Sequence, residues 1–121
     1  MDIFMRCIMA RIVSRRSHVV TMADANVAYR LGAVDLVGRF TSDFIVYVTS
    51  GNTAAQVYVG DSTVDATWIP WAKGAVLNYV SGSGAMAGTE TPLGFDLSKF
   101  YVMSPSAGDT VIVEYAAFVK L

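Results

Sequence analysis

The sequence predicts an all-β fold: a single-domain β-sandwich or jelly roll of about six to eight short antiparallel strands, with an atypical N-terminal arm. Two observations support this prediction. Runs rich in β-branched and aromatic residues recur along the chain, and turn residues such as Gly51-Asn52 and Gly60-Asp61 separate them. Within the runs, side chains alternate with the period of two that characterises a strand. A length of 121 residues fits one domain.

The expected strands follow these runs in order. Val34–Phe40 (VDLVGRF) is the first candidate. Helix signals are weak, and the best window, Asn26–Leu36, is interrupted by Gly32. Asp43–Ser50 (DFIVYVTS) comes next. Ala54–Gly60 (AAQVYVG) follows after a short turn, and this spacing predicts that the two runs form an antiparallel hairpin.

Four further strands are expected in the second half of the chain. Ala66–Ile69 ends before Pro70, whose missing N–H is typical of a strand end or a sheet edge. The remaining candidates are Val76–Val80, Lys99–Ser104 and Thr110–Lys120.

The alternation within two of these runs assigns side chains to opposite faces. In Thr110–Lys120, one face is wholly apolar: Val111, Val113, Tyr115, Ala117 and Val119. The other face is mixed: Ile112, Glu114, Ala116, Phe118 and Lys120. In Asp43–Ser50, one side holds Phe44, Val46 and Val48, and the other side holds Ile45 and Tyr47. Strands that are apolar on both faces lie between two layers or against a partner.

The first 30 residues differ from the rest, so we predict an N-terminal arm or extension over 1–30 and the β-sandwich or jelly-roll domain over 31–121. Residues 1–30 carry five arginines against two aspartates, whereas residues 31–121 carry four basic and eight acidic side chains. Met22-Ala23-Asp24 is typical of a protein start. Residues 1–21 are therefore either an added, poorly ordered extension or an arm that reaches a neighbouring subunit.

Composition favours association with other protein chains. Hydrophobic residues make up 54% of the chain and charged residues 16%, whereas a typical domain is about 25% charged. A small domain cannot bury all of its apolar side chains, so we expect part of this surface in a protein contact. The mildly acidic body argues against direct nucleic-acid binding, and no apolar run approaches the ~20 residues of a membrane span.

The sequence offers no recognisable catalytic, cofactor or metal site, and we predict that the protein is not an enzyme. Cys7 and His18 are the only residues of their kinds, which excludes an internal disulfide and a zinc cluster. Asp61 and Asp65 lack the close spacing of a calcium loop. Ser81–Gly88 is glycine-rich, but it lacks the strand-loop-helix context of a phosphate-binding loop.

Aromatic side chains are the candidate interface residues. The set consists of Tyr58, Trp68, Trp71, Tyr79 and Phe118. Trp68 and Trp71 bracket Ile69-Pro70, an unusual arrangement. Burial in the core, burial in a protein interface and stacking on a sugar ring all remain open for this pair.

Residues 43–118 resemble small β-structured virion proteins of tailed bacteriophages, in the class of capsid decoration (cement) and head-associated proteins. The resembling stretches are IVYVTSGNTAAQVYVGDSTVDAT and DLSKFYVMSPSAGDTVIVEYAAF. The resemblance implies a homo-oligomer, often a trimer, that binds the major capsid protein on the capsid exterior after synthesis in the bacterial host cytoplasm. It brings no active site and no cofactor.

We therefore expect a structural virion protein, most simply a capsid decoration or cement protein that stabilises the shell through subunit contacts. Two alternatives remain. One is a structural component of a tail or head fibre, and the other is a carbohydrate-binding β-sandwich module that uses Trp68 and Trp71.

Overall fold

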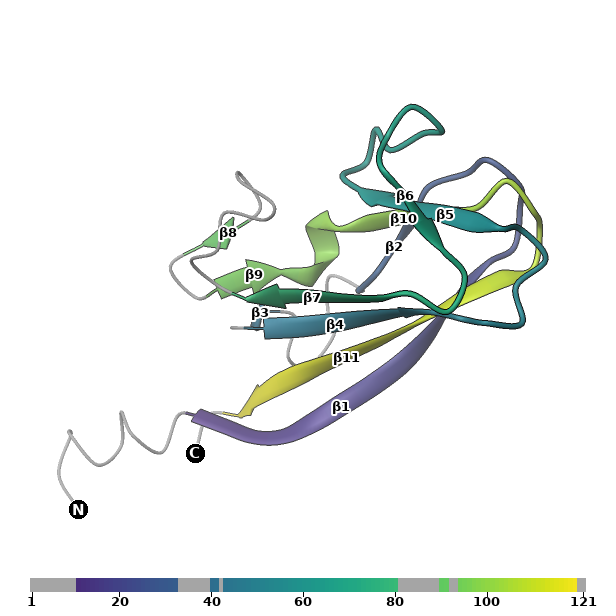
Figure 1. The fold of residues 1–121 in the computed structure, drawn as a ribbon. Helices are drawn as coiled ribbons and strands as arrows, with labels where there is room; N and C mark the ends of the chain where they lie inside the picture. Colours follow the sequence, from purple (N-terminus) through teal and green to yellow (C-terminus); the bar gives the residue numbers. More distant parts are fainter. Residues whose placement is uncertain (1–10, 33–39, 42, 81–89, 92–93, 120–121) are drawn as a thin grey trace, which may run out of the picture.

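The computed structural model describes residues 11–32, 40–41, 43–80, 90–91 and 94–119. These residues form a small β-sandwich of two four-stranded antiparallel sheets, with a three-stranded sheet beside them (Figure 1). The predicted all-β sandwich is confirmed, whereas a jelly-roll path stays a prediction. Among the described residues, no helix is long and apolar enough to cross a membrane.

The strands of each sheet come from distant parts of the chain. Sheet A has the order β1-β11-β4-β7, formed by β1 (Arg11–Met22), β11 (Asp109–Val119), β4 (Asp43–Val48) and β7 (Val76–Val80). Sheet B has the order β2-β10-β5-β6, formed by β2 (Tyr29–Arg30), β10 (Tyr101–Met103), β5 (Gln56–Gly60) and β6 (Pro70–Ala72). Sheet C is formed by β3 (Phe40–Thr41), β9 (Gly94–Asp96) and β8 (Glu90–Thr91), and a single 3₁₀ turn, η1 (Leu97–Lys99), leads into β10.

An aromatic cluster fills the core between sheets A and B. Phe44 stacks on Tyr79 with ring centroids 4.6 Å apart, and it meets Phe100 edge-on at 4.8 Å. Phe95 closes the cluster at 5.3 Å from Phe44. Such stacked and edge-to-face pairs stabilise a core beyond their burial alone.

The predicted hairpin between Asp43–Ser50 and Ala54–Gly60 is wrong, because β4 and β5 belong to different sheets. Strand β4 already has two neighbours, β11 and β7, so the short connection crosses from sheet A to sheet B. The Asn52 side chain holds that connection like an extra strand residue: it donates to the Thr110 carbonyl and accepts from the Thr110 amide, both at 2.9 Å.

The predicted strand over Ala66–Ile69 is also wrong, and the strand here begins at Pro70. The preceding residues form turns instead, because two aspartate side chains accept hydrogen bonds from nearby backbone amides. The Asp61 carboxylate accepts from the Thr63 amide, and the Asp65 carboxylate accepts from the Thr67 amide, each at 2.8 Å. Of the predicted strand Val34–Phe40, only the last residue lies within the described part of the chain.

Strand β1 places much of the predicted N-terminal arm inside the sandwich. Arg11–Met22 pairs with β11, and the side chains of Val20 and Met22 belong to the main core. A domain boundary after residue 30 would therefore cut through both sheets, because β1 is a strand of sheet A and β2 is a strand of sheet B. Residues 1–10, with Cys7, lie outside the described residues.

Candidate interaction site

An apolar cavity opens between the edge strands of the two sheets, where β7 of sheet A approaches β6 of sheet B and the turn before it. Its volume is about 430 Å³. Its lining is almost entirely apolar or aromatic: Val59, Trp68, Ile69, Trp71, Val76, Leu77, Asn78 and Tyr79. The cavity therefore brings together three of the five predicted interface residues, namely Trp68, Trp71 and Tyr79.

Trp68 reaches this cavity from the turn before β6 because Gly60 leaves room for its indole ring. A Cβ atom at Gly60 would lie 2.6 Å from two carbon atoms of that ring, which is closer than packed atoms allow. The same indole packs against a second, smaller cluster of Tyr58, Val64 and Met103. Trp68 is thus half-buried, and its side chain both packs on the smaller cluster and lines the cavity.

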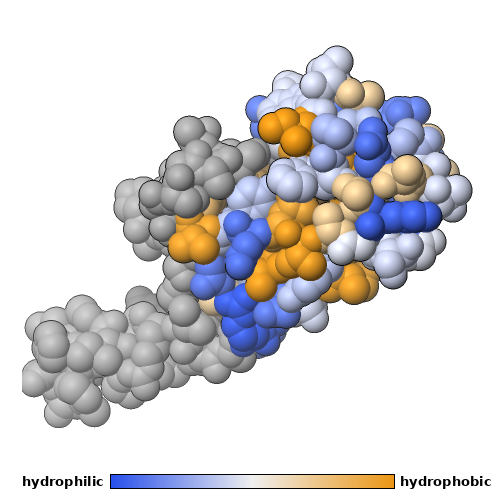
Figure 2. All heavy atoms as spheres, in the orientation of Figure 1, coloured by the Kyte–Doolittle hydropathy of each residue, from blue (hydrophilic) through white to orange (hydrophobic). Residues whose placement is uncertain are grey.

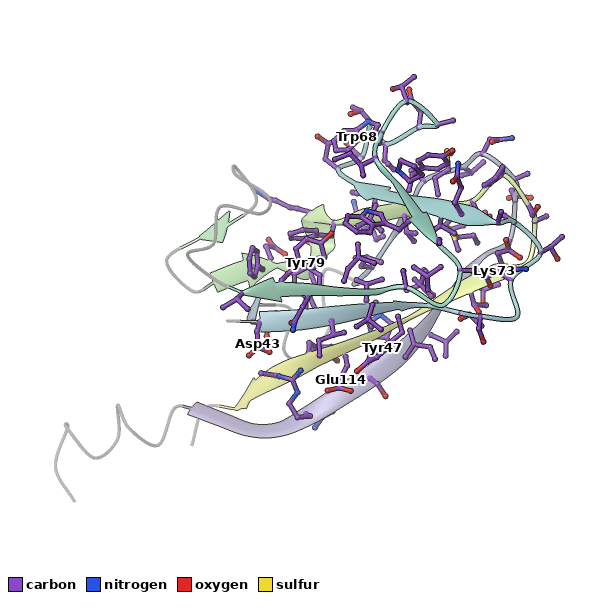
Figure 3. All side chains as sticks on the ribbon, in the orientation of Figure 1. Asp43, Tyr47, Trp68, Lys73, Tyr79 and Glu114 are labelled. Atoms are coloured by element: carbon purple, nitrogen blue, oxygen red, sulfur yellow. The ribbon has the colours of Figure 1, made fainter. Side chains whose placement is uncertain are left out.

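Tyr79 lines the cavity and also belongs to the main core. Its ring points inward from β7 between the two sheets (Figure 3), and burial raises the pKa of its hydroxyl to about 12. Trp71 is half-buried and packs on the edge of the main core. Because the lining offers few polar groups for sugar hydroxyls, it suits an apolar partner better than a carbohydrate.

The other two predicted interface residues do not line the cavity. Tyr58 is buried on β5, within the smaller cluster, and its hydroxyl accepts a hydrogen bond from the Gln56 side chain at 3.0 Å. Phe118 lies on β11 opposite Ile12, and its side chain lies outside the described residues. The structure thus gives Tyr58 a role in packing.

A second surface was not singled out by the sequence: an apolar row that crosses the outer face of sheet A. The register aligns four residues as cross-strand neighbours, one on each strand: Val19, Ile112, Tyr47 and Val76. The exposed fractions of the three aliphatic side chains are 59%, 37% and 57% for Val19, Ile112 and Val76. Three steps of about 4.8 Å between strands make this row roughly 14 Å long.

This row lies on the outer face of sheet A, because the flanking residues of the same strands point into the core: Val20, Val48, Val111 and Leu77. Apolar residues, in orange, gather over the strands of sheet A, and hydrophilic residues, in blue, border them (Figure 2). Tyr47 and Glu114 both project from this side (Figure 3). The sequence alternation puts Tyr47 and Ile112 on the second face of their strands, but the register that joins them to Val19 and Val76 is not visible in the sequence.

Charged residues lie at one end of the outer face. The Arg15 guanidinium contacts the carboxylates of Asp43 and Glu114, at 2.5 and 3.2 Å. The side-chain hydrogen bond to Asp43 is the main reason why the pKa of Arg15 is raised. All three side chains are at least one-third exposed, and exposed ion pairs contribute only about 0–1 kcal/mol. This cluster therefore shapes the border of the apolar row more than it stabilises the fold.

His18, the only histidine of the sequence, packs against the sandwich instead of lying in a poorly ordered extension. On β1, His18 stacks edge-on against Tyr115 at 5.8 Å, and its Nε2 atom hydrogen-bonds the Leu31 carbonyl. Within the described ranges, no three His, Cys, Asp or Glu side chains gather as metal ligands would. His18 thus ties sheet A to the start of the loop after β2.

No protein-family model and no curated protein matches this chain. Among solved structures, one match is a protein of the Bacillus endospore appendages, described as a family of disulfide-linked pili. It is 11% identical, covers 88% of this chain and 90% of that one, and superposes with a TM-score of 0.37. A likeness at this score carries no inference about function.

Proposed function

We propose that this protein is a structural subunit that packs against neighbouring protein chains through the outer face of sheet A. The observation that supports this proposal is the row of Val19, Ile112, Tyr47 and Val76, which crosses all four strands and leaves its aliphatic members more than a third exposed. Contiguous exposed apolar surface of this kind is typical of protein–protein contacts.

The more specific proposal is a capsid decoration protein of a tailed phage, which binds the major capsid protein from outside the shell. The sequence resemblance over residues 43–118 supports it. In this role the chain favours the assembled shell by its own binding free energy, since it binds the shell and not the separated capsomers. Self-association would strengthen that binding, because an oligomer engages several sites at once.

The test replaces the centre of the apolar row with a charge. We expect Ile112→Lys to weaken binding of the purified protein to capsid shells at least about tenfold, or about 1.4 kcal/mol, because a buried lysine would lose its hydration. Co-sedimentation with shells measures this effect. The matched control is Ala72→Lys, which adds the same charge at an exposed position on sheet B.

Three outcomes separate the two levels of the proposal. Loss of binding in Ile112→Lys but not in Ala72→Lys supports both levels. Wild-type binding by Ile112→Lys overturns the role of the outer face. If the wild-type protein does not sediment with shells at all, the decoration role fails, and an image of the whole particle then tests the tail and head-fibre positions.

A further inference from the structure

The four edges of sheets A and B are not equally protected against pairing with another strand. Proteins protect such edges with charged side chains, prolines, bulges or very short strands. Edge strand β1 carries Arg15 and Arg16 and has a register shift near Ile12. On sheet B, β6 begins with Pro70, and β2 is only two residues long.

Strand β7 has none of these protections. Its five residues, Val-Leu-Asn-Tyr-Val, include no charged residue and no proline, and they pair with β4 in an unbroken register. Its first and last valines are 57% and 53% exposed. The apolar cavity lies along the same strand. Within the described part of the chain, strand β7 is therefore the edge of the two main sheets that is open to a further strand.

The hydrogen-bond pattern shows which backbone groups β7 offers. The Val48 amide donates to the Ala75 carbonyl at 2.9 Å, and this places residue 75 on the side that faces β4. In an antiparallel ladder, the backbone N–H and C=O groups of every second residue point toward the same neighbouring strand. Leu77 and Tyr79 therefore turn their backbone groups toward β4, whereas Val76, Asn78 and Val80 turn theirs toward the free edge.

We propose that β7 pairs with β7 of a second copy of this chain, in an antiparallel arrangement with a two-fold axis at Asn78. The strand Val-Leu-Asn-Tyr-Val reads nearly the same in both directions. In this register each Val76 lies opposite Val80 of the other copy, and the two Asn78 residues face each other. All three outward-facing residues of each strand thereby exchange backbone hydrogen bonds.

The side chains of β7 and its lack of charged residues favour a second copy over an unrelated strand. A two-fold contact must be self-complementary, because the same patch serves on both sides. The paired valines would cover each other on the outer face, and two amide side chains can both donate and accept across the axis. No like charges meet, whereas two β1 strands would bring arginines together. The pairing joins two A sheets into one, and it does not depend on the outer-face contact proposed above.

The test places a charge on the two-fold axis. We expect Asn78→Asp and Asn78→Lys each to be monomeric, since each would face its own charge, and an equal mixture of the two to form a dimer. Light scattering on the full chain should give twice the 13.0 kDa chain mass for the wild-type protein and for the mixture. The control pair, Ala72→Asp and Ala72→Lys on the β6 edge, should leave the wild-type mass unchanged.

Hydrogen exchange on the wild-type protein provides a second test that needs no variant. Strand pairing predicts that the amides of Val76, Asn78 and Val80 exchange more slowly as protein concentration rises, while a contact through the outer face alone leaves these edge amides unprotected. The proposal is overturned if these amides remain unprotected at every protein concentration. It is also overturned if well-folded Asn78→Asp keeps the wild-type mass, and neither result affects the outer-face proposal.

Discussion

Strands β4 and β11 carry apolar side chains on both faces, yet the two faces have different surroundings. On the inner face, Phe44, Val46 and Val113 are completely buried. On the outer face, Tyr47 is half-buried and Ile112 is 37% exposed. Because side chains alternate with a period of two, the same strands can serve two purposes. The difference teaches that hydrophobicity alone does not tell whether a position stabilises its own chain or contacts a neighbour.

The largest effect that would test this comparison is expected at Phe44. Replacing Phe44 with Ala removes the ring that contacts Tyr79, Phe95 and Phe100, and it leaves a cavity that the packed sheets cannot close. We expect the free energy of unfolding to fall by about 3–5 kcal/mol. Urea denaturation measures it. A loss below about 1 kcal/mol would mean that the inner face is not the stabilising one.

The inner face was predictable because its signal is local. The alternation in Asp43–Ser50 and in Thr110–Lys120 predicts which side chains point inward, and Phe44, Val46, Val111 and Val113 are all buried. The partners of those strands were not predictable in the same way. A short turn after Asp43–Ser50 favoured a hairpin, but the bonds between Asn52 and Thr110 direct the chain to the other sheet.

The candidate site was predictable only in part, for the same reason. Trp68 and Trp71 stood out as a rare pair, and the structure places both on one cavity with Tyr79. Tyr58 carries the same kind of signal but is buried. The apolar row escaped prediction because Val19 and Ile112 become neighbours only through the pairing of β1 with β11, which no local pattern encodes.

The second prediction concerns the polar junction where β11 begins between the two sheets. The Asp109 carboxylate accepts hydrogen bonds from the amides of Thr53 and Ala54 and from the Ser104 hydroxyl, at 2.8, 3.0 and 2.9 Å. In Asp109→Asn, an NH₂ group would replace one of the accepting oxygens and leave a buried donor without an acceptor. We expect the free energy of unfolding to fall by about 1–3 kcal/mol near neutral pH, as measured by urea denaturation.

The pH dependence distinguishes this junction from simple packing. Burial raises the pKa of Asp109, but the hydrogen bonds from Ala54, Thr53 and Ser104 and the charge of Lys73 outweigh it, so that the pKa is lowered. A lowered pKa stabilises the fold above the unfolded value of about 3.9, and this contribution is lost as pH falls through the folded value. The difference in free energy of unfolding between the wild-type protein and Asp109→Asn should therefore become smaller in acid. If this difference stays constant down to low pH, the ionised Asp109 carboxylate is not what stabilises the junction.

The smallest effect is expected at Ile112, and it gives the closest comparison of the two faces. Because Ile112 points outward and Val113 inward from adjacent positions on one strand, threonine can replace a β-branched apolar residue on each face. In dilute protein, Ile112→Thr should change the free energy of unfolding by less than about 0.5 kcal/mol. Val113→Thr should cost about 1–3 kcal/mol, because it places a hydroxyl in the core. Equal costs at the two positions would mean that the isolated chain already covers its outer face, which would remove the reason to expect a neighbour there.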